Sequence, residues 1–421
     1  MKIIYPLLII MLFSMSTRAQ ESYSFTLDEA IHYALEHNYT VRNAALNIEA
    51  AEKQKWEATS FGLPQIDGTV DYQNWLKQAV TFIPAEITGG TPGEFEEVVF
   101  GAKQNMNATV TLNQILFDGS YLVGLQSART FLKISNLAKE KTDQSIREAV
   151  INAYGTVLVS KETIMILEKN KQVLEKNLNE TRALLENGFA EEQDFEQQQI
   201  TLSNINNELN KATRLEFISK QMFNITLGIP INQTVNLTEN LQTLALRSTD
   251  LDIVSTQFAL ENHIDFKIAD NKVESDALLV RYEKTKGMPS LNAFINYSQF
   301  ANNNNFIFFE NTGNWFDSSL IGVSLKIPIF SSLQRSSRTQ QAKINLKQSE
   351  IELDETSEKL KLQVSTAKNR YQFALDQFQT SSQNLVLAER IAEKEQIKFF
   401  EGLSSSINLT NVQNQLFSTQ Q

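Results

Sequence analysis

Hydrophobic and polar positions along this chain change their spacing several times, and the changes follow the same order twice. Apolar residues first recur with helical spacing, then alternate in two strand-like segments separated by a long polar loop. They then recur every seven residues through a long segment without proline. Each passage opens with a stretch that ends in Gly-x-Pro, at 38–64 and at 263–289. Because a repeat of this length indicates a duplicated structural unit, we predict one fold with internal pseudo-symmetry.

The first repeat is predicted over residues 20–230. Thr26 and Glu29 have the spacing of a capping box at a helix start, and Pro64 prevents the next helix from continuing. The elements predicted for this repeat are helices over 26–60, strands over about 65–75 and 107–116, a long helix over 118–186 and a return helix over 191–227.

An equatorial linker segment is predicted over 231–262, and the second repeat follows over 263–421. Its return helix is much shorter than that of the first repeat, so we expect it to be truncated. The predicted elements are a helix over 263–286, strands over about 290–300 and 318–329, a long helix over 332–401 and a return helix over 405–421.

The four strand-like segments each have one apolar and one polar face. In the first, Ile66, Val70 and Tyr72 alternate with polar residues, whereas Phe294 interrupts the polar face of the third. This alternation is typical of membrane-barrel strands, and it fits a soluble antiparallel sheet equally well. Four strands could not stand alone in lipid, because their open edges would leave backbone groups unpaired; sister subunits would be needed to close a barrel.

Heptad spacing runs through both long helices. In the second helix Leu346, Leu353 and Leu360 lie seven apart, which predicts a coiled-coil seam. About 70 residues of helix would extend on the order of 100 Å. A soluble helical bundle would show the same seam, so this feature alone leaves both interpretations open.

The N-terminus is typical of an exported protein. Lys2 precedes an apolar stretch, and a small-residue cleavage pattern ends at Ala19, so residues 1–19 are predicted to be a signal peptide. No later segment reaches 18 uninterrupted apolar residues, and we expect no helix to cross the inner membrane. The chain has no cysteine, which excludes disulfides and thiolate metal sites. Its net charge of −11 disfavours nucleic acid as a partner.

Several ordered features together carry a family resemblance. They are the segment Phe25–Ile31, the duplicated Gly-x-Pro, Leu116–Gly119 before the first long helix, and the lone glycines Gly188 and Gly402. With these features the chain resembles the TolC family of outer-membrane efflux proteins over essentially its whole mature length. The resemblance implies an all-α coiled-coil tunnel plus a transmembrane β-barrel. It has four strands per protomer and a trimeric, twelve-stranded barrel in the outer membrane of a Gram-negative bacterium, with a periplasmic extension.

The same resemblance implies a function and partners. The homotrimer would be the passive exit duct of a tripartite efflux or secretion system, carrying drugs, toxic compounds or exported substrates. A periplasmic adaptor (membrane fusion protein) would open it by docking at the helix tips. The inner-membrane pump would be of the RND type more readily than of the ABC type.

The helix tips are the implied docking and gating regions, although ordinary helix hairpin turns would have the same pattern. Two acidic ring positions of relatives are occupied here by Asn408 and Asn411, which lack carboxylate repulsion and strong cation binding. Asp194 matches an acidic latch residue, but its expected partners fall at Phe399 and Ser404, neither cationic; it also suits an early-helix acid favoured by the helix dipole. The implied adaptor-docking residues are Asn187, Gly188, Phe189, Ala190, Glu401, Gly402, Leu403 and Ser404.

The sequence has no catalytic motif, and we expect no enzyme activity, cofactor or metal. His32 and His37 lie five residues apart and on different helical faces, which makes a metal pair improbable. Two other classes stay open. One is an exported structural coiled-coil protein without transport activity. The other is an ordinary porin, which the long helices disfavour because porins have short periplasmic turns.

Overall fold

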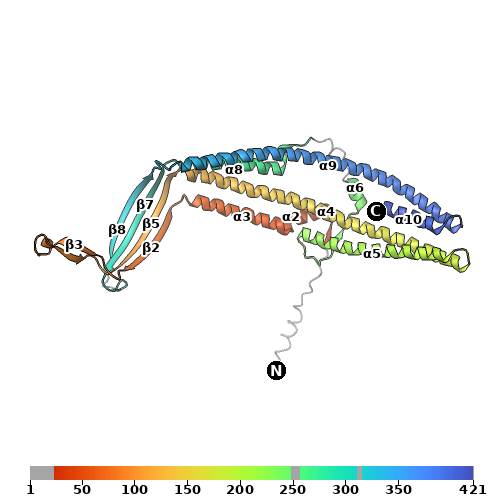
Figure 1. Cartoon of the computed structure of the whole chain (residues 1–421), viewed down its shortest axis with the longest axis horizontal. Coiled ribbons are helices and arrows are strands. Elements are labelled where there is room, and N and C mark those ends of the chain that lie inside the picture. Colours follow the sequence, from red (N-terminus) through yellow and green to blue (C-terminus); the bar gives the residue numbers. More distant parts are fainter. Residues whose placement is uncertain (1–22, 248–256, 311–314, 421) are drawn as a thin grey trace, which may run out of the picture. The chain divides into compact units, whose positions relative to one another are not determined.

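The strand pairs of the two repeats form a single sheet. The structure is a computed structural model and describes residues 23–247, 257–310 and 315–420. The sheet order is β2-β5-β7-β8, with every pair antiparallel, so the two repeats join along β5 and β7 (Figure 1). Within the described residues, β2 and β8 are the outer strands and each pairs on one side only. The strands are β2 (Gln65–Asn74), β5 (Gln104–Asp118), β7 (Ser290–Asn303) and β8 (Phe316–Lys326).

One face of this sheet is apolar and the other is polar. The row of directly opposed residues Ile66, Leu112, Ile295 and Ile321 is apolar on all four strands. A row on the opposite face carries only hydroxyl side chains; it consists of Thr69, Thr109, Ser298 and Ser318. Ile321 is 75% exposed, and a soluble sheet would be expected to cover such a face. The uncovered apolar face therefore favours the membrane interpretation of the alternation.

Phe294, which interrupts the polar alternation, lies opposite Gly322 in the β7–β8 pair. A Cβ atom at Gly322 would lie 2.5 Å from the Phe294 ring. The aromatic side chain therefore covers the strand position where glycine leaves no side chain of its own. Its place on the polar face is explained by local packing.

Aromatic side chains gather at one end of the apolar face. The Tyr72 ring contacts the rings of Phe306 and Phe308 edge-on, with centroids 5.5 Å and 6.0 Å apart. Trp315 Nε1 donates a hydrogen bond of 3.0 Å to the Phe308 carbonyl. Aromatic belts of this kind mark the interface between lipid and water in membrane proteins.

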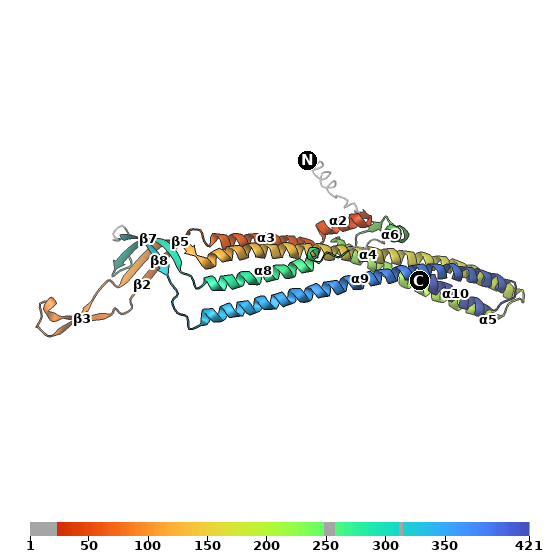
Figure 2. The same cartoon turned by 90° about the horizontal axis from the view of Figure 1, so that it is seen from above.

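The segment between β2 and β5 is more ordered than the polar loop expected from the sequence. It contains a second antiparallel pair, β3 (Val80–Pro84) and β4 (Phe95–Val99), with a short 3-10 helix η1 (Ala85–Ile87) between them (Figure 2). The Gly93 amide donates to Glu86 Oε1 over 2.8 Å and closes the turn. Apolar Val80 and Phe82 alternate with polar Thr81 at the start of β3, which is the spacing of a strand.

The helices belong to two compact units that cut across the repeats. Unit 1 comprises the described residues of 23–48, 136–268 and 354–420, and unit 2 comprises those of 49–135 and 269–353. The sheet lies in unit 2. The repeats are therefore units of sequence rather than of packing. The helices are α2 (Leu27–His37), α3 (Tyr39–Ser60), α4 (Gly119–Glu186), α5 (Glu192–Leu227), α6 (Leu241–Arg247), η2 (Leu260–Asn262), α8 (Ile264–Thr285), α9 (Gln334–Phe400) and α10 (Ser406–Gln420).

Some predicted segments lie outside the described residues. These are the signal peptide over 1–19, residues 248–256 of the equatorial linker, and residue 421 of the return helix. The described part of the linker contains β6 (Val235–Leu237), α6 and η2.

The main core of unit 1 forms where the N-terminal segment meets α4 and α5. The strand β1 (Tyr23–Phe25) pairs in parallel with β6 (Val235–Leu237). Tyr154 of α4 is fully buried, and its hydroxyl donates to the Phe25 carbonyl over 3.2 Å. Burial raises the pKa of Tyr154 to about 12, so this hydroxyl stays neutral. The other buried members of this core are Ala30, Ile31, Ala34, Val150, Val157, Leu158, Phe223, Leu227, Ile229 and Val235.

By length and composition alone, α4 is the one helix among the described residues that could cross a membrane. The core helix of a soluble unit has the same composition. α4 supplies Val150, Tyr154 and Val157 to the unit 1 core, and 28% of its apolar window is buried.

Two helix ends fit closely together beside this core. Asn38 separates α2 from α3; its Oδ1 accepts from the Thr40 amide over 2.7 Å, and its Nδ2 donates to the Thr226 carbonyl over 2.7 Å. Gly228 ends α5 with φ of 81°, and a Cβ there would lie 2.4 Å from the His37 carbonyl oxygen. Only glycine satisfies both the backbone conformation and the contact.

We predict that Gly228→Ala destabilises unit 1 by about 2 kcal/mol or more, because the left-handed conformation and the steric clash both carry a cost. The matched control is Gly155→Ala in α4, where a Cβ would meet no atom within 4 Å. That change should stabilise by about 0.5–1 kcal/mol. Thermal unfolding of the detergent-solubilised protein measures both. Equal midpoints for the two variants would contradict this packing.

Candidate docking and gating site at the helix tips

The first tip closes α4 with a Schellman turn, in which glycine permits a left-handed residue after the helix. Gly188 has φ of 76°. Its amide donates to the Leu185 carbonyl over 3.0 Å, and the Phe189 amide donates to the Leu184 carbonyl over 2.8 Å. These two bonds satisfy carbonyl groups that the end of the helix would otherwise leave unpaired.

The second tip closes α9 with the same turn. Gly402 has φ of 74°. Its amide donates to the Phe399 carbonyl over 3.1 Å, and the Leu403 amide donates to the Lys398 carbonyl over 2.8 Å. The duplication is therefore retained in the backbone hydrogen bonds of the tips.

Each turn presents one large apolar side chain to solvent. Phe189 is 81% exposed and Leu403 is 74% exposed. The residues predicted for docking all lie in or directly beside these turns. Those exposed together with Phe189 and Leu403 are Asn187, Gly188, Glu401 and Gly402, and those half-buried are Ala190 and Ser404.

Asp194 takes part in the start of the return helix α5. Its Oδ2 accepts a hydrogen bond of 3.1 Å from the Glu191 amide, as the third residue of a capping box does. The positions expected to pair with it in a latch have other contacts in this chain. Phe399 is buried against the Phe400 ring, and Ser404 donates to Glu395. The contacts of Asp194 are thus those of an acidic residue in the first turn of a helix.

A small polar network holds the second tip. Lys398 Nζ lies 3.2 Å from Glu395 Oε2, and Ser404 Oγ donates to the other oxygen of the same carboxylate. The hydrogen bond from Ser404, and then the bond and charge of Lys398, lower the pKa of Glu395 below its ordinary value. The return helix α10 begins just beyond, where Ser405 Oγ accepts from the Asn408 amide over 3.3 Å.

The two residues predicted for the constriction lie on one exposed face of α10. Asn408 and Asn411 are both exposed and three positions apart, which is the spacing of neighbours on a helix surface. Leu409 and Thr410 between them are buried. The face that carries the two amides is therefore free of packing within the described chain.

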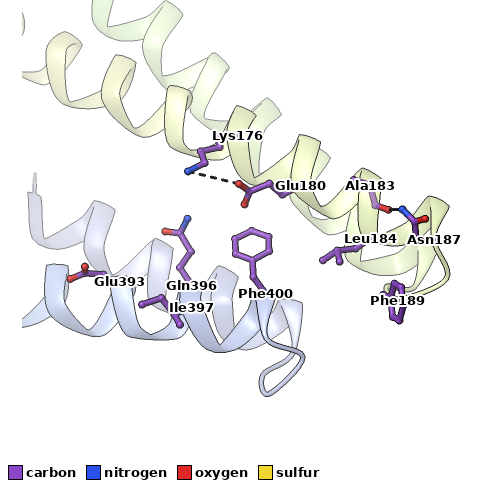
Figure 3. A pocket seen from close by; sticks show the side chains of 10 residues that line it. All are labelled: Lys176, Glu180, Ala183, Leu184, Asn187, Phe189, Glu393, Gln396, Ile397 and Phe400. Atoms are coloured by element: carbon purple, nitrogen blue, oxygen red, sulfur yellow. Dashed lines mark hydrogen bonds and ion pairs between the residues drawn. The ribbon is translucent and has the colours of Figure 1, made fainter.

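A groove of about 820 Å³ separates the ends of α4 and α9, both in unit 1 (Figure 3). Phe400 points into the space between the helices, while Lys176 and Glu180 form an ion pair of 3.8 Å on the α4 side. Asn187 and Phe189 of this lining were predicted from the sequence, whereas the members on α9 come close to them only through packing of the two helices. The lining residues are Lys176, Glu180, Ala183, Leu184, Asn187 and Phe189 from the α4 tip, and Glu393, Gln396, Ile397 and Phe400 from α9.

The chain thus combines a four-stranded sheet that has an exposed apolar face with long helices that end in two hairpin turns. The family model for outer membrane efflux proteins matches residues 30–217 and 256–421. The chain therefore belongs to the outer membrane efflux protein family, also called the TolC family. It is a non-enzymatic transport protein of the outer membrane and has a periplasmic helical extension. Channels of this family form trimers.

Individual relatives are distant in sequence but alike in fold. The outer membrane efflux protein BepC of Brucella suis is 21% identical over 413 residues, which cover 95% of this chain and 82% of BepC. The CusC structure superposes with a TM-score of 0.73 at 16% identity, covering 94% of this chain and 86% of CusC. VceC of Vibrio cholerae gives 0.71 at 14% identity, covering 94% and 90%. The predicted fold class is confirmed by these matches.

We predict that Ser404→Ala loosens the second tip at neutral pH and raises the pKa of Glu395 towards its ordinary value. A spin label on Leu403→Cys, in a chain without native cysteines, would report this as greater mobility. Because the folded-state pKa of Glu395 is depressed, the contribution of the network is present above the ordinary pKa. It is lost as pH falls through the folded value. The labelled proteins with and without Ser404→Ala should therefore differ at pH 7 and converge in acid; a difference that persists unchanged in acid would contradict the network.

Proposed function

We propose that three copies of this chain form the exit duct of a tripartite efflux system and that an adaptor opens it from the helix tips. The observation that carries this proposal is that both tips have the same backbone hydrogen-bond pattern, with a groove between α4 and α9 beside them. Three copies supply twelve strands, enough for a barrel that leaves a lumen, whereas two would supply eight and a filled interior. Small molecules delivered by an inner-membrane pump would pass through that lumen.

The chemistry of the tips supports a helical hairpin as the docking partner. An apolar helix face can lie in the groove between α4 and α9, in the manner of helix-in-groove recognition. Phe189 and Leu403 would be the anchors, because exposed large apolar side chains dominate such contacts. The first return helix begins with the exposed acidic residues Glu191, Glu192 and Glu196, so basic residues on the partner would complement it.

The amide face of α10 supports a neutral constriction. We propose that Asn408 and Asn411 of three copies ring the periplasmic end of the lumen. Amide rings can narrow a pore, but they do not hold cations as carboxylate rings do. The resting barrier in this protein is then steric and depends on helix position rather than on charge.

We predict that single cysteines at Phe189 or Leu403 crosslink to the adaptor, because both side chains project from the tips. The chain has no native cysteine, so any thiol adduct reports the introduced site alone. The control is Ile225→Cys on α5, which is 53% exposed and lies near the opposite end of that helix. Adducts at the control but at neither tip would remove the docking assignment.

We predict that Asn408→Asp with Asn411→Asp makes the pore cation-selective and sensitive to divalent-cation block. Two adjacent rings of three carboxylates attract cations, and the attraction is strong where water is scarce. Single-channel recording in planar bilayers measures selectivity and block. Asn207→Asp on the exposed surface of α5 adds the same kind of charge elsewhere and should leave both unchanged. If both variants behave alike, Asn408 and Asn411 do not line the constriction.

A further inference from the structure

The two strand pairs of the sheet are related by a constant shift in sequence. Gln65 pairs with Asn113 in β2–β5. Ser290 pairs with Lys326 in β7–β8. Ser290 lies 225 positions after Gln65. Lys326 lies 213 positions after Asn113. The same two shifts convert every opposed pair of β2–β5 into an opposed pair of β7–β8. The duplication is therefore retained residue by residue in the register of the sheet.

The same shifts give a register for the strand pairing that the described chain lacks. Between the repeats, Leu112 of β5 lies opposite Ile295 of β7. Shifting each residue to its counterpart places Leu325 of β8 opposite Val70 of the partner subunit. The strands β2 and β8 run in opposite directions, because each pair in the described sheet is antiparallel. The edges of two copies can therefore pair as β5 and β7 do within one copy.

An exposed apolar segment beyond β8 fits this register. Phe330 is 83% exposed. Its counterpart in the first repeat is Phe117 of β5, which lies opposite Leu291 of β7. The shift places Ile66 of the partner subunit opposite Phe330. Strand β5 continues through its equivalent segment with β7 beside it, whereas β8 ends earlier, with its outer edge open. A partner strand at that edge would extend β8 and bring Phe330 beside an apolar side chain.

Charged side chains on the polar face of the two edges complement each other in this register. Lys326 lies opposite Thr69 of the partner subunit. Asp67 and Asp71 flank Thr69 on the same face of β2, because side chains alternate between faces along a strand. Within the residues that the structure describes, Lys326, Asp67 and Asp71 form no salt bridge. Diagonal neighbours across an antiparallel pair lie about 7–8 Å apart, which a lysine side chain can span, and opposite charges stabilise such pairs.

We propose that β8 pairs with β2 of a second copy in the register of β5–β7, and that Lys326 forms an ion pair with Asp67 or Asp71 of the partner subunit. This inference rests on the proposed function, since a ring of copies is what brings β8 to β2. A second copy fits the open edge in strand direction, in its apolar rows and in charge. A slip by one residue is excluded, because it would turn the apolar side chains of one strand to the polar face.

The test places one cysteine on each edge of the sheet, in a chain that has none of its own. Val323→Cys with Tyr72→Cys is an opposed pair on the apolar face, and Leu320→Cys with Trp75→Cys is one on the polar face. Hydrogen-bonded and non-hydrogen-bonded sites alternate along an antiparallel pair, so one of the two variants has the shorter Cα separation. Both separations allow a disulfide. After mild oxidation of trimers in detergent, we expect covalent dimers and trimers on a gel without reductant.

The matched controls move one cysteine by two positions and keep it on the same face. They are Val323→Cys with Val70→Cys, and Val323→Cys with Asn74→Cys. We expect crosslinking at least about tenfold slower than in the opposed pair, because diagonal neighbours are farther apart. A control that crosslinks faster than both opposed pairs would overturn the register, as would no crosslink in either opposed pair within trimers that still conduct. Wild-type protein that forms no trimer or no conducting pore would instead count against the duct.

Charge reversal tests the ion pair without cysteines, and it keeps the proposal testable if a cysteine variant fails to assemble. Lys326→Glu would place a carboxylate beside Asp67 and Asp71 of the partner subunit, and like charges across a strand pair are destabilising. We expect the temperature at which trimers dissociate in detergent to fall. Adding Asp67→Lys and Asp71→Lys reverses all three charges and should restore most of that shift. Lys284→Glu, at an exposed position of α8, is the control and should cause no shift. A triple variant that dissociates as readily as Lys326→Glu alone would remove Lys326 from the interface.

Discussion

The unpaired outer edges of the sheet constrain everything else in this protein. In lipid, each backbone amide or carbonyl left without a partner costs several kcal/mol, and no water is present to replace it. The edges of β2 and β8 cannot be satisfied by another strand of the described chain. Further copies must therefore supply the missing strands before the apolar face of the sheet can enter a membrane. Association of several copies is therefore a condition for insertion into the membrane.

The periodic parts of the fold could be predicted from the sequence. The strands alternate because one face is apolar and the other polar, and their pairing in Figure 1 follows the duplication. The long helix expected over 118–186 corresponds to α4 (Gly119–Glu186). The pattern could not decide between a soluble sheet and a membrane sheet, because both alternate in the same way. The exposure of Ile66, Ile295 and Ile321 on one face favours the membrane sheet.

Other features could not be predicted because they depend on contacts between distant segments. The pairing of β1 with β6 and the close fit of Gly228 against His37 join the first helix to the end of α5. On α4 the polar Asn177 and Thr181 are more deeply buried than the apolar Leu178 and Leu185 near them. A prediction that places only apolar residues in the contact between helices therefore misses buried polar residues such as these. The glycines in the sequence indicate where the tips lie. The groove between α4 and α9 is visible only once the two helices are packed together.

The Schellman turns at the two tips have a consequence for engineering. Their geometry depends on backbone hydrogen bonds and on one glycine each, so the exposed side chains of Phe189 and Leu403 are under little constraint from folding. The two tips already differ in these side chains. The first carries Phe189 followed by an acidic segment, and the second carries Leu403 followed by an amide-rich segment. Recognition could accordingly be transplanted between homologous channels by exchanging a few surface residues. The backbone of the turn would stay the same, and the exchanged side chains would determine which partner binds.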